Sequence, residues 1–178
     1  MERNELERLF NRHGFDDFKW IDPKTIVVAQ WVRMKCLFGC GDYGRNASCP
    51  PNTPPVSECE RFFREYKEVV IFHFEKKVAK PEDRHDWTRE IERRLLALER
   101  EVFLSGHPKA FLLALDSCSF CDACPGIRTA CKEPRLARPT SDAMAVDVFA
   151  TVRSVGYPIE VLSDYDQKMN RYAFLLIA

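Results

Sequence analysis

Cys118-Ser119-Phe120-Cys121-Asp122-Ala123-Cys124-Pro125 is the stretch around which the rest of this chain is organised, together with Cys131 shortly after it. Its cysteines follow the spacing C-x2-C-x2-C-x6-C, which lets one loop turn every sulfur toward a common centre. Bacterial-type iron–sulfur sites use a C-x2-C-x2-C run with a further cysteine, often near proline. Zinc sites more often combine two separated C-x2-C pairs, or cysteine pairs with histidine pairs. The spacing therefore favours an iron–sulfur cluster, with zinc as the main alternative and free thiols or disulfides as the remaining one.

A first group of cysteines lies earlier in the chain and comprises Cys36, Cys40 and Cys49. The surrounding segment, residues 39–55, contains three Gly and four Pro and is predicted to be a loop with restricted geometry. Cys59 follows and has two readings: a fourth ligand, or a small core residue on the apolar side of a helix. In the second case the first group has three thiolates and an open position, at which a substrate could bind.

Composition and charge limit the classes of protein that fit this chain. Its 178 residues favour a single domain, 1–178, in which residues 1–24 form a helix and a lead-in. Lys and Arg total 27 and Asp and Glu total 27, so net charge gives no reason to expect nucleic acid as a partner. The apolar runs are too short to span a membrane, and the N-terminus lacks the apolar region of a secretory signal. We therefore expect a cytoplasmic protein, in which eight cysteines are more often ligands than disulfides.

Hydrophobic periodicity predicts a mixed α/β fold with about five strands and several helices. The long helix is marked by Trp87, Ile91, Leu95, Leu98 and Val102 at helical spacing, and the charges from Arg89 to Arg94 are expected mostly to face solvent. The apolar run Ala110–Leu115 predicts a central strand covered on both faces. The predicted helices are 2–12, 57–66, 81–105 and 140–154, and the predicted strands are 25–32, 69–74, 110–115, 158–162 and 172–177.

Both cysteine groups directly follow a predicted strand, 25–32 in one case and 110–115 in the other. The order strand–helix–strand–helix–strand between them favours parallel neighbours joined by crossover helices. Open α/β sheets bind their ligands at the carboxyl ends of the strands. The sequence therefore predicts two cysteine-rich loops that meet at one edge of the sheet.

The pattern as a whole resembles a known family. Cys36-x3-Cys40-x2-Tyr43-Gly44-x4-Cys49-Pro50-Pro51, together with the second group, Pro134 and Arg138-Pro139, is similar to the two motifs of an uncharacterised family of predicted metal-binding, cysteine-rich proteins. The resemblance covers residues 25–178, and Ser119 departs from it, because relatives often have Gly there. It implies metal binding and a domain of unknown function, and it names no reaction.

The functional expectation is one or two [4Fe-4S] clusters that serve electron transfer or support a redox partner protein. The alternatives are a zinc-stabilised binding module and an enzyme that uses an open cluster at the first group. Basic residues near both groups would offset the negative charge of a thiolate-bound cluster, unless they are surface charges or salt-bridge partners. No set of catalytic residues stands out, and the oligomeric state is left open. The candidate ligands are Cys118, Cys121, Cys124, Cys131, Cys36, Cys40, Cys49 and Cys59.

Overall fold

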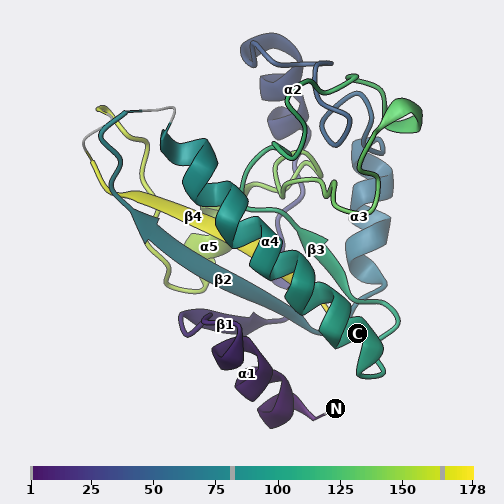
Figure 1. Ribbon diagram of the computed structural model, residues 1–178, viewed down its shortest axis with the longest axis vertical. Coiled ribbons are helices and arrows are strands. Elements are labelled where there is room, and N and C mark those ends of the chain that lie inside the picture. Colours follow the sequence, from purple (N-terminus) through teal and green to yellow (C-terminus); the bar gives the residue numbers. More distant parts are fainter. Residues whose placement is uncertain (1, 81–82, 165–166) are drawn as a thin grey trace.

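A four-stranded antiparallel sheet forms the centre of the computed structural model, which describes residues 2–80, 83–164 and 167–178. The strands lie in the order β1-β2-β4-β3 (Figure 1). The central pair, β2 and β4, is aligned over its full length, from Val69 opposite Leu176 to Lys76 opposite Met169. The strands are β1 (Phe18–Ile21), β2 (Val69–Lys76), β3 (Phe111–Leu113) and β4 (Met169–Leu176).

Helices α1 (Arg3–Arg12) and α4 (Asp83–Leu104) cover one face of the sheet (Figure 1). Phe10 and Leu95 are fully buried there against Phe72. These two helices confirm the predictions over 2–12 and 81–105, although residues 81–82 lie outside the described residues. Their apolar positions recur at helical spacing, which is why local pattern was sufficient to identify them.

The opposite face is covered by α3 (Val56–Arg64) and α5 (Val148–Ser154), whose Phe63 and Val152 pack in one core with Phe174. Helix α2 (Gln30–Gly39) lies with α3 and the cysteine loops in a lobe beside the sheet (Figure 1). The residues that the structure describes also form two single turns of 3-10 helix, η1 (Pro23–Thr25) and η2 (Arg128–Ala130). Within the described ranges, no helix is long and apolar enough to cross a membrane.

The outer edge of β3 is closed by side chains of α4. The Leu112 N–H donates to Glu99 Oε1 at 2.8 Å, and the Asp116 N–H donates to Glu92 Oε1 at 2.9 Å. Between them, the Ala114 N–H donates to the Pro139 carbonyl at 2.8 Å. An edge strand would otherwise leave these donors unpaired. Glu92 is buried, which makes it an exception among the charges from Arg89 to Arg94 that were expected mostly to face solvent.

The strand predicted over 25–32 is wrong. Thr25 is the last residue of η1, and α2 begins at Gln30. Between them, Val28 makes an isolated bridge to Val146. The β-branched residues Ile26 and Val28 pack toward the core of the α3 face as single contacts, without a ladder. The actual first strand, β1, was missed because Phe18 to Ile21 is only four residues long and mixes lysine with aromatic residues.

Topology differs from the prediction as well. The sheet is antiparallel throughout and has four strands among the described residues. β4 lies between β2 and β3 and pairs antiparallel with both. β3 is consequently an outer strand rather than a central one, and residues 158–162 form no strand. The helix predicted over 140–154 begins only at Val148, where Asp147 caps it by accepting the Ala150 N–H at 2.9 Å.

Candidate metal centre

The two cysteine loops pack directly against each other, although about seventy residues separate them in sequence. The Asn46 side chain donates from Nδ2 to the Cys118 carbonyl at 2.9 Å. The neighbouring Ala47 N–H donates to the Cys124 Sγ at 3.3 Å. The two groups thus lie in one region, as the sequence predicts, but the parallel strands that were expected to bring them there do not exist.

Asn52 is a second connection between the loops. Its Nδ2 donates to the Asn46 carbonyl at 3.2 Å and to the Gly126 carbonyl at 2.9 Å, while its Oδ1 accepts the Arg128 N–H at 3.0 Å. Gly126 has φ +73°, and a Cβ built there would lie 3.0 Å from the Gly44 carbonyl oxygen. Only glycine allows both this conformation and this approach, so the loops are fitted to each other.

The first group gathers near the C-terminus of α2. Cys36 lies in that helix, Cys40 follows its end, and Cys49 lies in the loop. Burial raises the pKa of the Cys49 thiol to about 12, and the negative charges of Asp142, Cys36, Cys40 and Cys118 add to the effect. Burial and Asp142 also raise the pKa of Cys36. The electrostatic influence of Cys118 on Cys49 again places the two groups close together.

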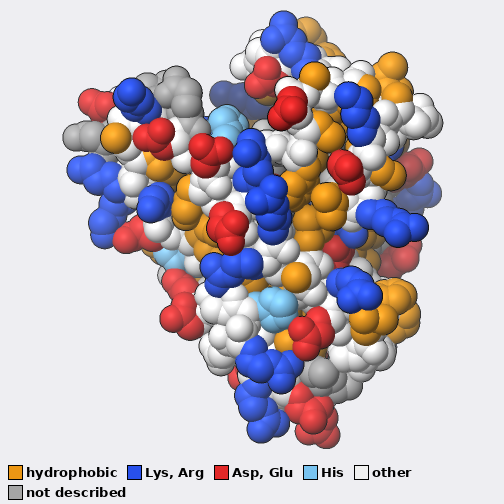
Figure 2. Space-filling model, viewed as in Figure 1, with side chains coloured by type: hydrophobic (Ala, Val, Ile, Leu, Met, Phe, Trp, Pro, Cys, Tyr) orange, Lys and Arg blue, Asp and Glu red, His pale blue; other side chains and the backbone are white. Residues whose placement is uncertain are grey.

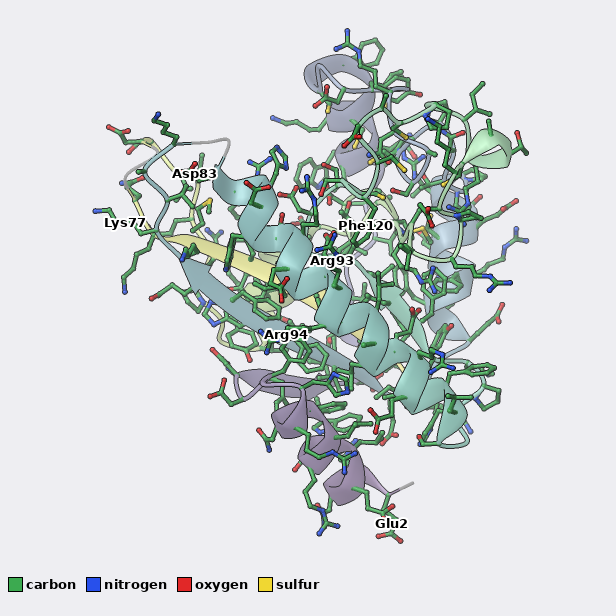
Figure 3. The ribbon with its side chains drawn as sticks, viewed as in Figure 1. Glu2, Lys77, Asp83, Arg93, Arg94 and Phe120 are labelled. Atoms are coloured by element: carbon green, nitrogen blue, oxygen red, sulfur yellow. The ribbon has the colours of Figure 1, made fainter. Side chains whose placement is uncertain are left out.

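The second group lies in the loop that follows β3. Burial raises the pKa of the Cys118 thiol, and Cys131 and Cys121 contribute in the same direction, whereas the Phe120 backbone N–H opposes the rise. Arg89 of α4 donates from Nε to the Ser119 hydroxyl at 3.5 Å, so this loop also contacts the helix, beside which Phe120 is labelled in Figure 3. Mutual repulsion among thiolates is the electrostatic cost that a bound cation relieves.

Cys59 stands apart from the other cysteines. It is fully buried in α3 and belongs to the apolar core with Phe63 and Met144. Its Sγ lies 3.5 Å from the Pro54 carbonyl, and no other thiol contributes to the rise in its pKa, which burial causes. This position in the core agrees with the packing role of Cys59 rather than with the role of a fourth ligand.

The cysteines fit a soft metal by their chemistry but are not assembled around an ion. All eight are free thiols, which are the ligands that zinc and iron–sulfur clusters prefer. Among the described residues, no three His, Cys, Asp or Glu side chains converge closely enough to hold a metal ion as they stand. The residues available to hold a metal are Cys36, Cys40, Cys49, Cys118, Cys121, Cys124 and Cys131.

Several basic residues near the cysteines bind protein groups. Arg33 donates to the carbonyls of Pro54 and Ala143, Arg128 donates to the Pro134 carbonyl, and Arg138 pairs with the buried Glu99 at 2.9 Å. Over the face shown in Figure 2, Lys and Arg side chains are interspersed with Asp and Glu. The contacts of these three arginines agree better with a role in salt bridges and structural hydrogen bonds than with a role as counter-charges to a cluster.

Sequence reasoning missed Asn46, Asn52 and Asp142, which shape the site. The asparagines lie in a loop rich in Gly and Pro, where asparagine side chains commonly bond to nearby backbone. That composition was the available signal. Asp142 carries no such signal, because its effect on Cys36 and Cys49 comes from the fold.

Comparison with known proteins gives one result. No curated protein and no solved structure matches the chain. Residues 19–177 match the DUF2284 family, described as predicted metal-binding proteins, and the chain with its two cysteine motifs belongs to that family.

Proposed function

We propose that the paired cysteine loops hold an iron–sulfur centre, [4Fe-4S] in type, and that the protein transfers electrons or supports a redox partner protein. The observation that carries this proposal is the contact between the loops, in which the Ala47 N–H donates to the Cys124 sulfur. Backbone N–H donors to ligand sulfurs raise the reduction potential of iron–sulfur clusters. A cluster bound here would supply one-electron chemistry, and this chain's part is to position the thiols.

The spacing of the second group supports a cluster over a single zinc ion. Its C-x2-C-x2-C-x6-C run is of the kind that bacterial-type iron–sulfur sites use. Zinc sites more often combine two separated C-x2-C pairs, or cysteine pairs with histidine pairs. Zinc that stabilises a binding module is the competing function.

A second candidate function follows from the position of Cys59. If the core retains this residue, the first group offers three thiols, Cys36, Cys40 and Cys49, and a bound cluster would keep one open position. An open position can bind a substrate, which makes catalysis at the first group the second candidate.

Anaerobic purification followed by metal and sulfide analysis tests the proposal. We expect brown protein with matched iron and acid-labile sulfide, about four of each per chain for one cluster and about eight for two. Colourless protein with stoichiometric zinc and no sulfide would contradict the iron–sulfur assignment and support the binding module.

A further inference from the structure

A cleft of about 950 Å³ opens where β3 separates from β4. β3 pairs only with Phe174 to Leu176, so residues 169–172 of β4 have no strand on that side and line the cleft. The opposite walls come from α2, from the start of α5 and from residues 159–162. Ligand sites of small molecules are commonly of this size.

Arg171 contributes a cation to this cleft without a partner. The residue is only partly exposed, and within the described part of the chain its guanidinium makes no hydrogen bond and no ion pair. Asp116, the acid that influences Arg171 most, is bound by Arg84 at 2.7 Å. Burial lowers the pKa of Arg171 and Arg84 adds to the effect, whereas the charges of Asp116 and Asp142 oppose it. Burying an unpaired charge costs stability, and proteins keep such groups mainly at functional sites.

The other polar groups of the cleft leave Arg171 available. Ser141 also lines it, and its buried hydroxyl has no hydrogen-bond partner among the described residues. Three carboxylates are present: Asp147 caps α5, Glu160 is exposed, and Asp142 is exposed but still raises the pKa of Arg171 without bonding to it. Lys35 adds a second cation.

The remaining surface of the cleft is largely apolar. Trp31 of α2 is half-exposed at its wall, and Val148, Phe149 and Leu162 line it as well. A cation with an apolar surround suits a molecule that is charged at one end and hydrophobic over the rest.

We propose that this cleft binds a small organic anion, a carboxylate with an apolar body, whose carboxylate pairs with Arg171 and whose body lies against Trp31. Cys36 and Cys40 line the same cleft, so the bound molecule would lie beside the first cysteine group. This ligand site stands whichever metal the thiols hold.

Calorimetric titration of the protein as isolated, with benzoate, phenylacetate and hexanoate as probes, tests the site. We expect saturable binding of at least one of them and at least tenfold weaker binding in Arg171→Gln. Benzamide, phenylacetamide and hexanamide are the matched neutral probes and should not bind measurably. Arg93→Gln removes an exposed charge from α4 (Figure 3) and should leave binding unchanged. Absence of binding for all three carboxylates, or equal binding of an amide and its acid, would overturn the proposal.

A second measurement covers the case in which Arg171→Gln does not fold. In the wild-type protein, the bound carboxylate should shift the indole N–H resonance of Trp31, which is assigned by its loss in Trp31→Phe. The Trp20 indole, which donates to Glu7 of α1 at 2.8 Å, serves as the internal control. A shift confined to the Trp20 indole would place the ligand elsewhere and contradict the site.

Discussion

Glu92 is a single residue whose burial should govern how stability depends on pH. Desolvation raises its pKa from 4.5 to about 8, against the opposing effect of the Asp116 N–H. Between these values the folded state binds more protons than the unfolded state, so the free energy of unfolding falls as pH rises. The slope approaches about 1.4 kcal/mol per pH unit. Glu92→Gln keeps an acceptor for the Asp116 N–H and should flatten this slope.

Urea denaturation of both proteins from pH 5 to pH 8 checks this expectation. The variant should match the wild type near pH 5 and exceed it in stability near pH 8. Glu90→Gln, an exposed neighbour on the same helix, should follow the wild-type profile. Parallel profiles for Glu92→Gln and wild type would show that Glu92 does not titrate in this range.

Two cysteine substitutions should have opposite consequences. Cys59→Ala removes a sulfur from the α3 core and should cost about 1 kcal/mol of stability while leaving the iron content intact. Cys121→Ala removes a thiol from the exposed loop and should lose most of one cluster. Iron per chain and the paramagnetic signal of the reduced protein distinguish the two. Loss of a full cluster in Cys59→Ala would make the first group a closed four-thiolate site and remove the basis for catalysis there.

At the scale of elements, the stability of the paired loops should depend on the asparagines that join them. Asn52→Ala removes the partner of the part-buried Gly126 carbonyl and of the exposed Arg128 N–H, at a cost of about 0.5–1.5 kcal/mol for each hydrogen bond. We expect faster proteolysis in both 39–55 and 117–134 and a lower iron content. Asn11→Ala, on an exposed position of α1, is the control and should change neither. Proteolysis that increases in one loop alone would show that Asn52 does not couple them.

Elements with strong local periodicity were predictable, and those defined by distant partners were not. Helix α4 carries its apolar stripe over many turns, so its sequence alone identifies it. The segment from Thr25 to Val32 has strand-like residues, yet they meet single contacts across the fold and the chain turns into α2. β-propensity describes fit to a half-buried surface, and that surface need not be a sheet.

At the scale of the whole molecule, the order of strands could not be read from the chain, because it depends on which distant segments pair. The same limit applies to the site. Cysteine spacing identified the candidate ligands, but spacing alone could not choose between the two roles of Cys59, which depend on the core around α3. The role of Arg171 could not be predicted for a similar reason, since the sequence does not show which groups surround a single arginine in a strand.

The place of β4 has a consequence for biosynthesis. It is the last of the four strands along the chain, yet it lies between β2 and β3. Until residues 169–176 leave the ribosome, β2 and β3 share no neighbour, while both cysteine loops have already been translated. For a time on the order of seconds, the nascent chain therefore carries thiols without the scaffold that apposes them. Oxidation can reach the thiols in that interval, and we expect metal to bind the apposed loops only after the final strand has arrived.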